Sequence, residues 1–265
     1  PTFMLVPTRG EYYLLDAAFE LKVRRTLFQC PGPLGKGVLV TPTVHGNTLI
    51  GPNAEVIEDG EDTATTKLGL SEVAKRARHS VLNLRFSENI RSFAGVRANQ
   101  LVDEFHLAWA ALQFYDVAAI KSPGLSAAPA IARYVINALE EAGLLLTKKP
   151  SWNGSRTSIH FADLTNEEKA EIIEEDPSYG RIICRCQTIT EGEILEAMRS
   201  PIPPRSIDGV KRRTGAGLGR CQGGFCGPRV HELLREHMGY KPEEVLLDGV
   251  GSYVVTGNNR PGNEA

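Results

Sequence analysis

CRCQTITEGEI at residues 184–194 and RCQGGFCGP at residues 220–228 hold four of the five cysteines in a chain of 265 residues. The first pair is spaced Cys-x-Cys and the second Cys-x4-Cys, and the pairs are separated by residues 187–220. Two tight pairs of thiolates can hold a metal centre, and the glycines of the second pair let backbone N–H groups approach a bound anion. The spacing therefore predicts a metal centre on Cys184, Cys186, Cys221 and Cys226.

The residues alone leave the identity of this centre open. Four thiolates suit a structural zinc ion as well as an iron–sulfur cluster. A redox disulfide is less favoured, because the start of the sequence lacks the regions of a signal peptide and we expect a reducing compartment. Basic residues near the cysteines would offset the negative charge of a thiolate-ligated cluster. They are Arg181, Arg185, Lys211, Arg212, Arg213, Arg220 and Arg229.

The stretches ICRC and TGAGLGRCQGGFCGPRV resemble the bacterioferritin-associated-ferredoxin-like (BFD-like) [2Fe–2S] domain, a small helical module. The resemblance covers about residues 181–239 and implies that the four cysteines are the cluster ligands. The Cys-x4-Cys spacing is similar to versions of this module that are fused to flavoprotein dehydrogenases. The resemblance favours a [2Fe–2S] cluster over zinc.

The rest of the chain indicates an α+β fold. Short apolar or β-branched runs broken by Gly, Pro and Asn predict strands at 11–16, 24–30, 36–43, 47–52, 89–98 and 112–120. Helical spacing predicts helices at 69–84 and 122–144, the second with Ser126 as its N-cap, and a short acidic helix from Thr165. In the cysteine-rich segment we expect helices at 190–199, 206–213 and 226–238.

Three stretches of the first 150 residues contain candidate binding residues: KGVLVTPTVHGNTLIGPNAE (36–55), IRSFAGVRA (90–98) and AAIKSPGLSAAPAIARYV (118–135). Arg97 could make a bidentate pair with a substrate carboxylate or phosphate, and a surface salt bridge is the alternative. His45 could act as a general base, although a single histidine is more often structural. The third stretch reads as a strand, a turn and a helix N-terminus, which would suit a flavin oxygen or any anion.

Together these stretches resemble the D-amino-acid-oxidase-type FAD-dependent oxidoreductases, with most likeness to the anaerobic glycerol-3-phosphate dehydrogenase and L-2-hydroxyglutarate oxidase-like branches. The resemblance covers about residues 1–150. It implies that Ser122, Gly124 and Leu125 contact the flavin and that Arg97 binds the substrate anion. His45 falls in the segment that lines the site in that family.

One feature of the family is absent from this sequence: the GxGxxG loop that holds the FAD pyrophosphate. GAGLGR at 215–220 has a similar pattern, but Cys221 follows it directly, so we interpret it as part of the cluster-binding turn. We expect the chain to be the C-terminal part of a longer flavoenzyme that binds FAD weakly or not at all by itself.

The expected fold is therefore a mixed or antiparallel substrate-domain sheet with helices, followed by a small all-α [2Fe–2S]-binding domain. Residues 1–150 would form the C-terminal part of an FAD-dependent oxidoreductase, with the substrate sheet and the last flavin-contacting helix. Residues 151–180 would form a linker, residues 181–240 the BFD-like domain and residues 241–265 a C-terminal tail.

The expected parent enzyme oxidises an anionic secondary alcohol, either glycerol 3-phosphate or a 2-hydroxy acid, and passes electrons through the cluster to an acceptor protein or subunit. One alternative is a zinc- or cluster-bearing binding module without catalysis, and another is a flavin-dependent amine or amino-acid dehydrogenase. A formal net charge of −2 argues against nucleic-acid binding, and no apolar run reaches the roughly 20 residues of a membrane span. We expect a cytoplasmic protein, with attachment to the inner face of the membrane through a partner subunit as the alternative.

Overall fold

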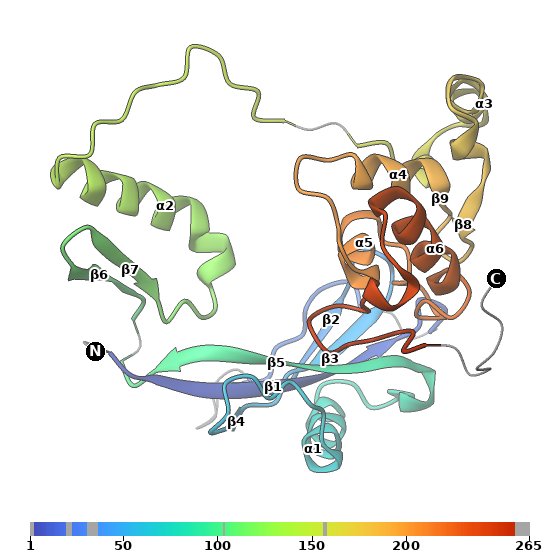
Figure 1. Cartoon of the computed structure of the whole chain (residues 1–265). Helices are drawn as coiled ribbons and strands as arrows, with labels where there is room; N and C mark the ends of the chain where they lie inside the picture. The colour runs from blue at the N-terminus through green and yellow to red at the C-terminus, as the bar shows by residue number, and fades with distance from the viewer. Residues whose placement is uncertain (1–2, 20–22, 31–36, 103, 156–157, 258–265) are drawn as a thin grey trace. The chain divides into compact units, whose positions relative to one another are not determined.

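The computed structural model describes residues 3–19, 23–30, 37–102, 104–155 and 158–257. The chain divides into two compact units, Pro1–Trp152 and Asn153–Ala265 (Figure 1). Residues 258–265 of the expected C-terminal tail lie outside the described residues. Among the residues described, no helix combines the length and apolar character that crossing a membrane requires.

The first unit is built on an antiparallel five-stranded sheet, as expected from its sequence. Its strands are β1 (Leu5–Leu15), β2 (Leu39–Pro42), β3 (Thr48–Gly51), β4 (Glu55–Val56) and β5 (Asn89–Gln100). Strand β1 is the central strand: β3 and β4 pair with one edge of it, β5 pairs with the other, and β2 pairs with β3.

The pairing of β1 with β5 decides which side chains share a face of the sheet. Thr8 lies opposite Arg97, and Gly10 lies opposite Gly95. Directly opposed residues of antiparallel strands project to the same face. Arg97 therefore lies on the same face as the two glycines.

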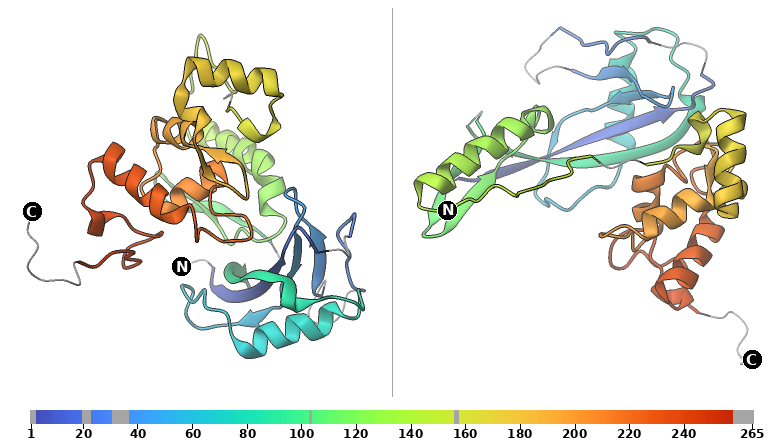
Figure 2. Two further views of the ribbon diagram at one scale, coloured as in Figure 1. Left: turned by 90° about the vertical axis from the view of Figure 1, so that its right-hand side faces the viewer. Right: turned by 90° about the horizontal axis from the view of Figure 1, so that it is seen from above.

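Helix α1 (Lys67–Ala77) covers the other face of this sheet, as Figures 1 and 2 both show. Its Val73 and Ala77 are fully buried with Leu15 of β1 and Ile50 of β3. The remaining buried members of this core are Phe19, Val38, Val40 and Leu84. Burying such apolar side chains is the main force that holds the helix on the sheet.

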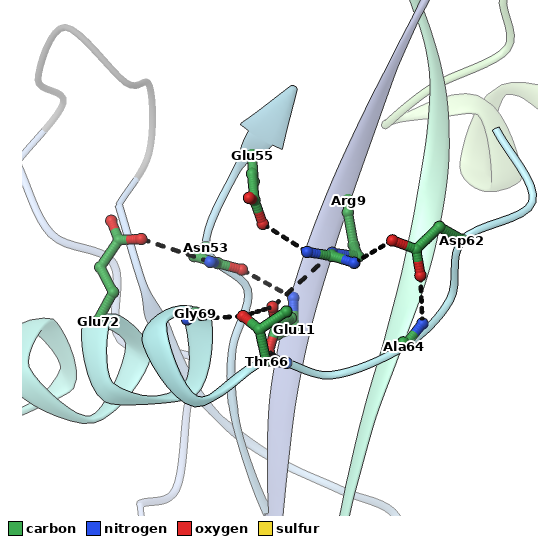
Figure 3. Close-up of polar contacts among 9 residues, drawn as sticks. All are labelled: Arg9, Glu11, Asn53, Glu55, Asp62, Ala64, Thr66, Gly69 and Glu72. Carbon is green, nitrogen blue, oxygen red and sulfur yellow. Dashed lines mark hydrogen bonds and ion pairs between the residues drawn. The ribbon is translucent and has the colours of Figure 1, made fainter. Parts of the chain in front are cut away.

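A buried carboxylate fixes the start of α1 against β1 (Figure 3). Glu11 is completely buried, and it accepts hydrogen bonds of 2.8 Å from both the backbone N–H and the hydroxyl of Thr66. Thr66 is in turn the N-cap of α1 and accepts from the N–H of Gly69. Beside Glu11, the buried Arg9 pairs with Glu55 of β4 and with Asp62. These contacts tie residues 55–69 to the central strand.

A hairpin and a long helix complete the first unit. They are β6 (His106–Ala111), β7 (Phe114–Ala118) and α2 (Gly124–Glu141). Helix α2 leaves apolar side chains in solvent: Leu125 is 93% exposed, and Tyr134 and Ile136 are also exposed. Helix α2 therefore carries more apolar side chains than the described residues bury.

The second unit is mainly helical. Its helices are α3 (Asn166–Glu175), α4 (Glu191–Met198), α5 (Ile207–Thr214) and α6 (Gly227–Met238), with one short strand pair, β8 (Ile182–Cys184) and β9 (Ile189–Thr190). Short 3-10 turns occur in this unit at Phe161–Asp163, Pro177–Gly180 and Pro242–Glu244, and one in the first unit at Phe86–Glu88. Capping boxes begin α3 at Thr165 and α4 at Thr190. The core contains Ile194, Val210, Leu233, Leu234 and two cysteines.

The α+β fold class is confirmed, whereas several expected boundaries were wrong. Residues 24–30 do not form a strand, and their pairing with β2 is a single bridge between Leu27 and Val40. Helix α1 ends at Ala77 rather than near residue 84. Ser126 is not the N-cap of α2: its hydroxyl donates to the carbonyl oxygen of Pro123, one turn earlier. The strand β6 was not expected at all.

Candidate metal centre and anion-binding strand

Four segments of the second unit bring the four cysteines to one cavity. Cys184 ends β8, Cys186 lies in the turn to β9, Cys221 lies in the turn that follows α5, and Cys226 is the N-cap of α6. The sulfur of Cys186 is 3.9 Å from that of Cys184 and 3.8 Å from that of Cys221. All four line a cavity of about 290 Å³ together with Arg185, Arg220 and Phe225. The structure therefore gathers the four predicted ligands.

The cavity has a buried side and an exposed side. Cys184 and Cys226 are 1% and 2% exposed and belong to the hydrophobic core of the unit. Cys186 is exposed and Cys221 is half-buried. A group held by these sulfurs would be anchored in the core at one edge and would face solvent at the other.

Backbone N–H groups surround the sulfurs. Gly217 and Gln187 donate to Cys184. Gly223 and Phe225 donate to Cys221, and the N–H of Cys221 donates to Cys186. Such donors stabilise the negative charge of thiolates and of a bound cluster. The donor set therefore fits an anionic iron–sulfur centre.

Glycines are required where the backbone approaches the sulfurs. A Cβ atom on Gly219 would lie 2.3 Å from the sulfur of Cys186. Gly217 and Gly223 have positive φ angles of 95° and 89°, which side chains rarely adopt. GAGLGR thus forms the turn between α5 and Cys221, as interpreted from the sequence, and not a dinucleotide-binding loop.

The thiols differ in acidity. A hydrogen bond donated by the Cys226 thiol lowers the pKa of Cys184 to about 5, and backbone donors add to this effect. The amides of Phe225 and Gly223 lower the pKa of Cys221. Burial raises the pKa of Cys186 to about 11, and the pKa of Cys226 is raised because its proton is shared with Cys184. One cysteine of each pair therefore favours the thiolate that binds metal.

The four sulfurs converge, although they do not form a closed site for one ion. Within the described parts of the chain, no group of three or more His, Cys, Asp or Glu side chains is arranged to hold a metal ion. The sulfurs nevertheless line one cavity at contact distances, and this convergence is the geometric support for a centre. Four cysteine thiolates are a ligand set that [2Fe–2S] clusters use.

In the first unit, Arg97 lies on β5 beside a pair of glycines. Its Nη2 atom would be 2.8 Å from a Cβ atom on Gly10, so only glycine leaves room for the guanidinium there. The space above the opposing Gly95 is open. Among the described residues, no carboxylate forms an ion pair with Arg97. A half-buried guanidinium without an ion pair, beside open space, can bind an anion.

Aromatic side chains border this region of the sheet. Tyr12 and Phe93 are paired across β1 and β5, and their rings stack with centroids 5.0 Å apart. By alternation they share the face of Arg97. Gly10, Gly95, Tyr12 and Phe93 were not predicted from the sequence, because only the strand register shows that they are neighbours.

The other predicted site residues lie on other elements of the first unit. His45 is exposed in the turn between β2 and β3, near the pairing of Thr48 with Leu15. Arg97 lies opposite Thr8 of β1. The stretch of β1 from Thr8 to Leu15 is about 23 Å long, and this length separates Arg97 from the region of His45. Ser122 precedes α2, Gly124 is its first residue, and Leu125 is exposed on it.

Two family models match the sequence. Residues 1–138 match the FAD dependent oxidoreductase family, and residues 182–236 match the BFD-like [2Fe-2S] binding domain. The first match covers just over half of the chain. The second contains all four clustered cysteines.

Two known proteins similar to this chain are named for glycerol 3-phosphate. A glycerol 3-phosphate dehydrogenase of Caloramator mitchellensis is 48% identical over 256 residues, which are 96% of this chain and 53% of that protein. A glycerol 3-phosphate oxidase of Mycoplasma pneumoniae is 37% identical over 150 residues, 55% of this chain and 38% of that protein. This chain thus spans about half the length, or less, of these relatives.

One solved structure is similar in both sequence and fold. It is the dithionite-reduced L-alpha-glycerophosphate oxidase of Mycoplasma pneumoniae with FAD bound. The similarity has a TM-score of 0.53 at 36% sequence identity, and it covers 58% of this chain and 40% of that one.

Proposed function

The chain belongs to the FAD dependent oxidoreductase family, and from that premise we propose that it supplies the substrate sheet and the cluster module of a dehydrogenase for an anionic secondary alcohol. The proposed substrate is glycerol 3-phosphate or a 2-hydroxy acid. The main supporting observation is that one chain has four cysteines around one cavity and, on the sheet of the first unit, an arginine that pairs with no carboxylate of the described residues. The names of the relatives favour glycerol 3-phosphate.

Arg97 is the residue that we propose holds the substrate anion. Its planar guanidinium can donate two parallel hydrogen bonds to a phosphate or a carboxylate. Gly10 leaves room for the guanidinium and Gly95 leaves open space beside it. The Tyr12–Phe93 stack borders that space and would exclude water from one side of a bound substrate. His45 lies too far along the sheet to act at the same small molecule, so the proposed site is centred on Arg97 alone.

Two cofactors supply the redox chemistry when bound: FAD takes up a hydride, and a [2Fe–2S] cluster carries single electrons. Cys184, Cys186, Cys221 and Cys226 would hold the cluster, and the surrounding amides would stabilise its charge. By resemblance to the family, Ser122, Gly124 and Leu125 would contact the flavin. The exposed side of the cysteine cavity gives an electron acceptor access to the centre.

The role of Arg97 is tested in the full-length flavoenzyme that contains this chain, loaded with FAD and with an artificial dye as acceptor. Arg97→Ala should raise the KM for glycerol 3-phosphate by about one to two orders of magnitude, because a charge-assisted anion contact is lost. Arg91→Ala is the matched control, since Arg91 is an exposed arginine on the same strand. An unchanged KM in the Arg97 variant would contradict the proposal.

The same assay separates the alternatives. Dye reduction with amino acids or other amines, but not with glycerol 3-phosphate or 2-hydroxy acids, would support an amine dehydrogenase. Zinc without iron or sulfide in the purified chain would support a binding module.

A further inference from the structure

The loop between Cys221 and Cys226 holds an aromatic side chain in solvent. The backbone N–H of Phe225 donates to the sulfur of Cys221, while its side chain is 79% exposed. The backbone of Phe225 thus contacts the cysteine site, whereas its exposed ring contributes little to the folding of the loop. Exposed aromatic residues on ordered loops are frequent anchors of protein interfaces.

The surroundings of this ring are basic. Arg185 and Arg220 line the same cavity as Phe225, and no Asp or Glu is among the described residues that line it. Arg185 is exposed, and no carboxylate of the described residues pairs with it. Cys186, the exposed cysteine of the site, lies directly after Arg185. The exposed edge of the cavity therefore combines an apolar anchor with positive charge.

We propose that this surface, the Phe225 face (Arg185, Cys186, Arg220 and Phe225), docks an acidic one-electron carrier protein. Phe225 would bury its ring against the carrier, and the arginines would steer and orient the carrier's carboxylates. When bound, the reduced cluster would supply one electron, which the oxidised cofactor of the carrier would accept without any bond being made or broken. The direction of transfer rests on the proposed function, whereas the docking itself rests on the surface.

Membrane lipid is a poorer occupant of the Phe225 face. Lipid-binding surfaces of soluble proteins usually combine about four to eight basic residues, whereas two arginines border this cavity. A small basic rim around one aromatic anchor resembles the composition of a protein interface more than that of a lipid-binding surface.

The test is calorimetric titration of the cluster-loaded chain with an acidic flavodoxin at low and at high salt. Binding should weaken as salt rises. Phe225→Ala should weaken it roughly tenfold or more, because a central aromatic anchor is removed. Arg185→Glu should weaken it similarly and reduce its salt dependence. Ile202→Ala and Arg205→Glu are matched controls, because both residues are exposed in the same unit and neither lines the cavity.

Three results would overturn the docking proposal: no binding of flavodoxin, equal loss in the control variants, or Phe225-dependent binding to phosphatidylglycerol vesicles in place of flavodoxin. Iron and sulfide contents of the same samples report on the proposed function separately. Flavodoxin binding through Phe225 to a chain without iron would support the docking face and contradict the electron route. A cluster-loaded chain that does not bind flavodoxin would contradict the docking face while still supporting the cluster of the proposed function.

Discussion

At the scale of single residues, Gly219 shows how closely the backbone approaches the cysteine site. A side chain there would meet the sulfur of Cys186 at 2.3 Å and the side-chain amide of Gln187 at 2.8 Å. We expect Gly219→Ala to lower iron and acid-labile sulfide per chain by at least about half, because the turn must move away from the sulfur. Gly227→Ala is the control, since a Cβ atom at Gly227 meets nothing within 4 Å. Equal cluster contents in the two variants would refute this view of the turn.

Glu191 is the buried carboxylate that joins two arginines at the start of α4. It accepts two hydrogen bonds from Arg181, of 2.7 and 2.9 Å, and one of 3.4 Å from Arg229. Glu191→Gln should lower the free energy of unfolding by about 1–2 kcal/mol near neutral pH. Urea unfolding measures this free energy. The control is Glu232→Gln, at the exposed partner of Arg229, which should change the free energy of unfolding little.

The contribution of Glu191 should also depend on pH. The hydrogen bond from Arg181 lowers the pKa of this carboxyl below its ordinary 4.5 in the folded chain, and Arg229 adds to that effect. A lowered folded pKa gives stability that is complete above the unfolded pKa and is lost as pH falls through the folded pKa. The stability difference between wild type and Glu191→Gln should therefore shrink in acid. A difference that stayed constant down to the acid transition would contradict this linkage.

At the residue level, the sequence was most informative where a feature is local. The four cysteines lie in two short segments, and the structure gathers them at one cavity. Thr165 was predicted as a helix start and forms a capping box with Glu168. By contrast, nothing in the local sequence places Gly10 beside Arg97, because that neighbourhood depends on pairing between β1 and β5.

At the scale of elements, the contact between α1 and the buried Glu11 reverses the usual preference of a helix for Ala over Gly. Ala normally stabilises a helix relative to Gly by about 1 kcal/mol. At Gly69, however, a Cβ atom would lie 2.1 Å from Oε1 of the buried Glu11. Gly69→Ala should therefore destabilise the first unit by about 1–3 kcal/mol.

Thermal or urea unfolding of the first unit measures the effect of Gly69→Ala. Ser71→Ala is its control, because Ser71 is exposed on the same helix and the change should be neutral or slightly stabilising. A Gly69 variant more stable than wild type would show that Glu11 does not fix the helix as described.

Helices were more predictable than strands. The expected helices at 190–199, 206–213 and 226–238 correspond to α4, α5 and α6 within about one residue, because caps and Gly-rich stops mark their ends. Residues 24–30 had β-branched and apolar residues but formed one bridge only. Strand formation requires a partner of matching register, which a single sequence does not reveal.

At the scale of the whole molecule, the chain combines a unit that matches the FAD dependent oxidoreductase family with one that matches the BFD-like [2Fe-2S] binding domain. Cys184 and Cys226 belong to the core of the second unit, with Ile194, Leu233 and Leu234. A metal centre on these cysteines would therefore stabilise that unit in particular.

Removal of iron should test this coupling. Chelation under reducing conditions should lower the melting temperature of the second unit and leave the transition of the first unit nearly unchanged, because their cores are separate clusters. Calorimetry with and without chelator measures the two transitions. A lower melting temperature of the first unit alone would show that the metal is not bound by the cysteines of the second unit.

The central claim is that four sulfurs hold one [2Fe–2S] centre, and its composition can be measured directly on anaerobically prepared protein. The account predicts about two iron atoms and two acid-labile sulfides per chain, with visible absorption, and loss of both on Cys184→Ser or Cys226→Ser. One zinc ion per chain, with no sulfide and no colour, would contradict it.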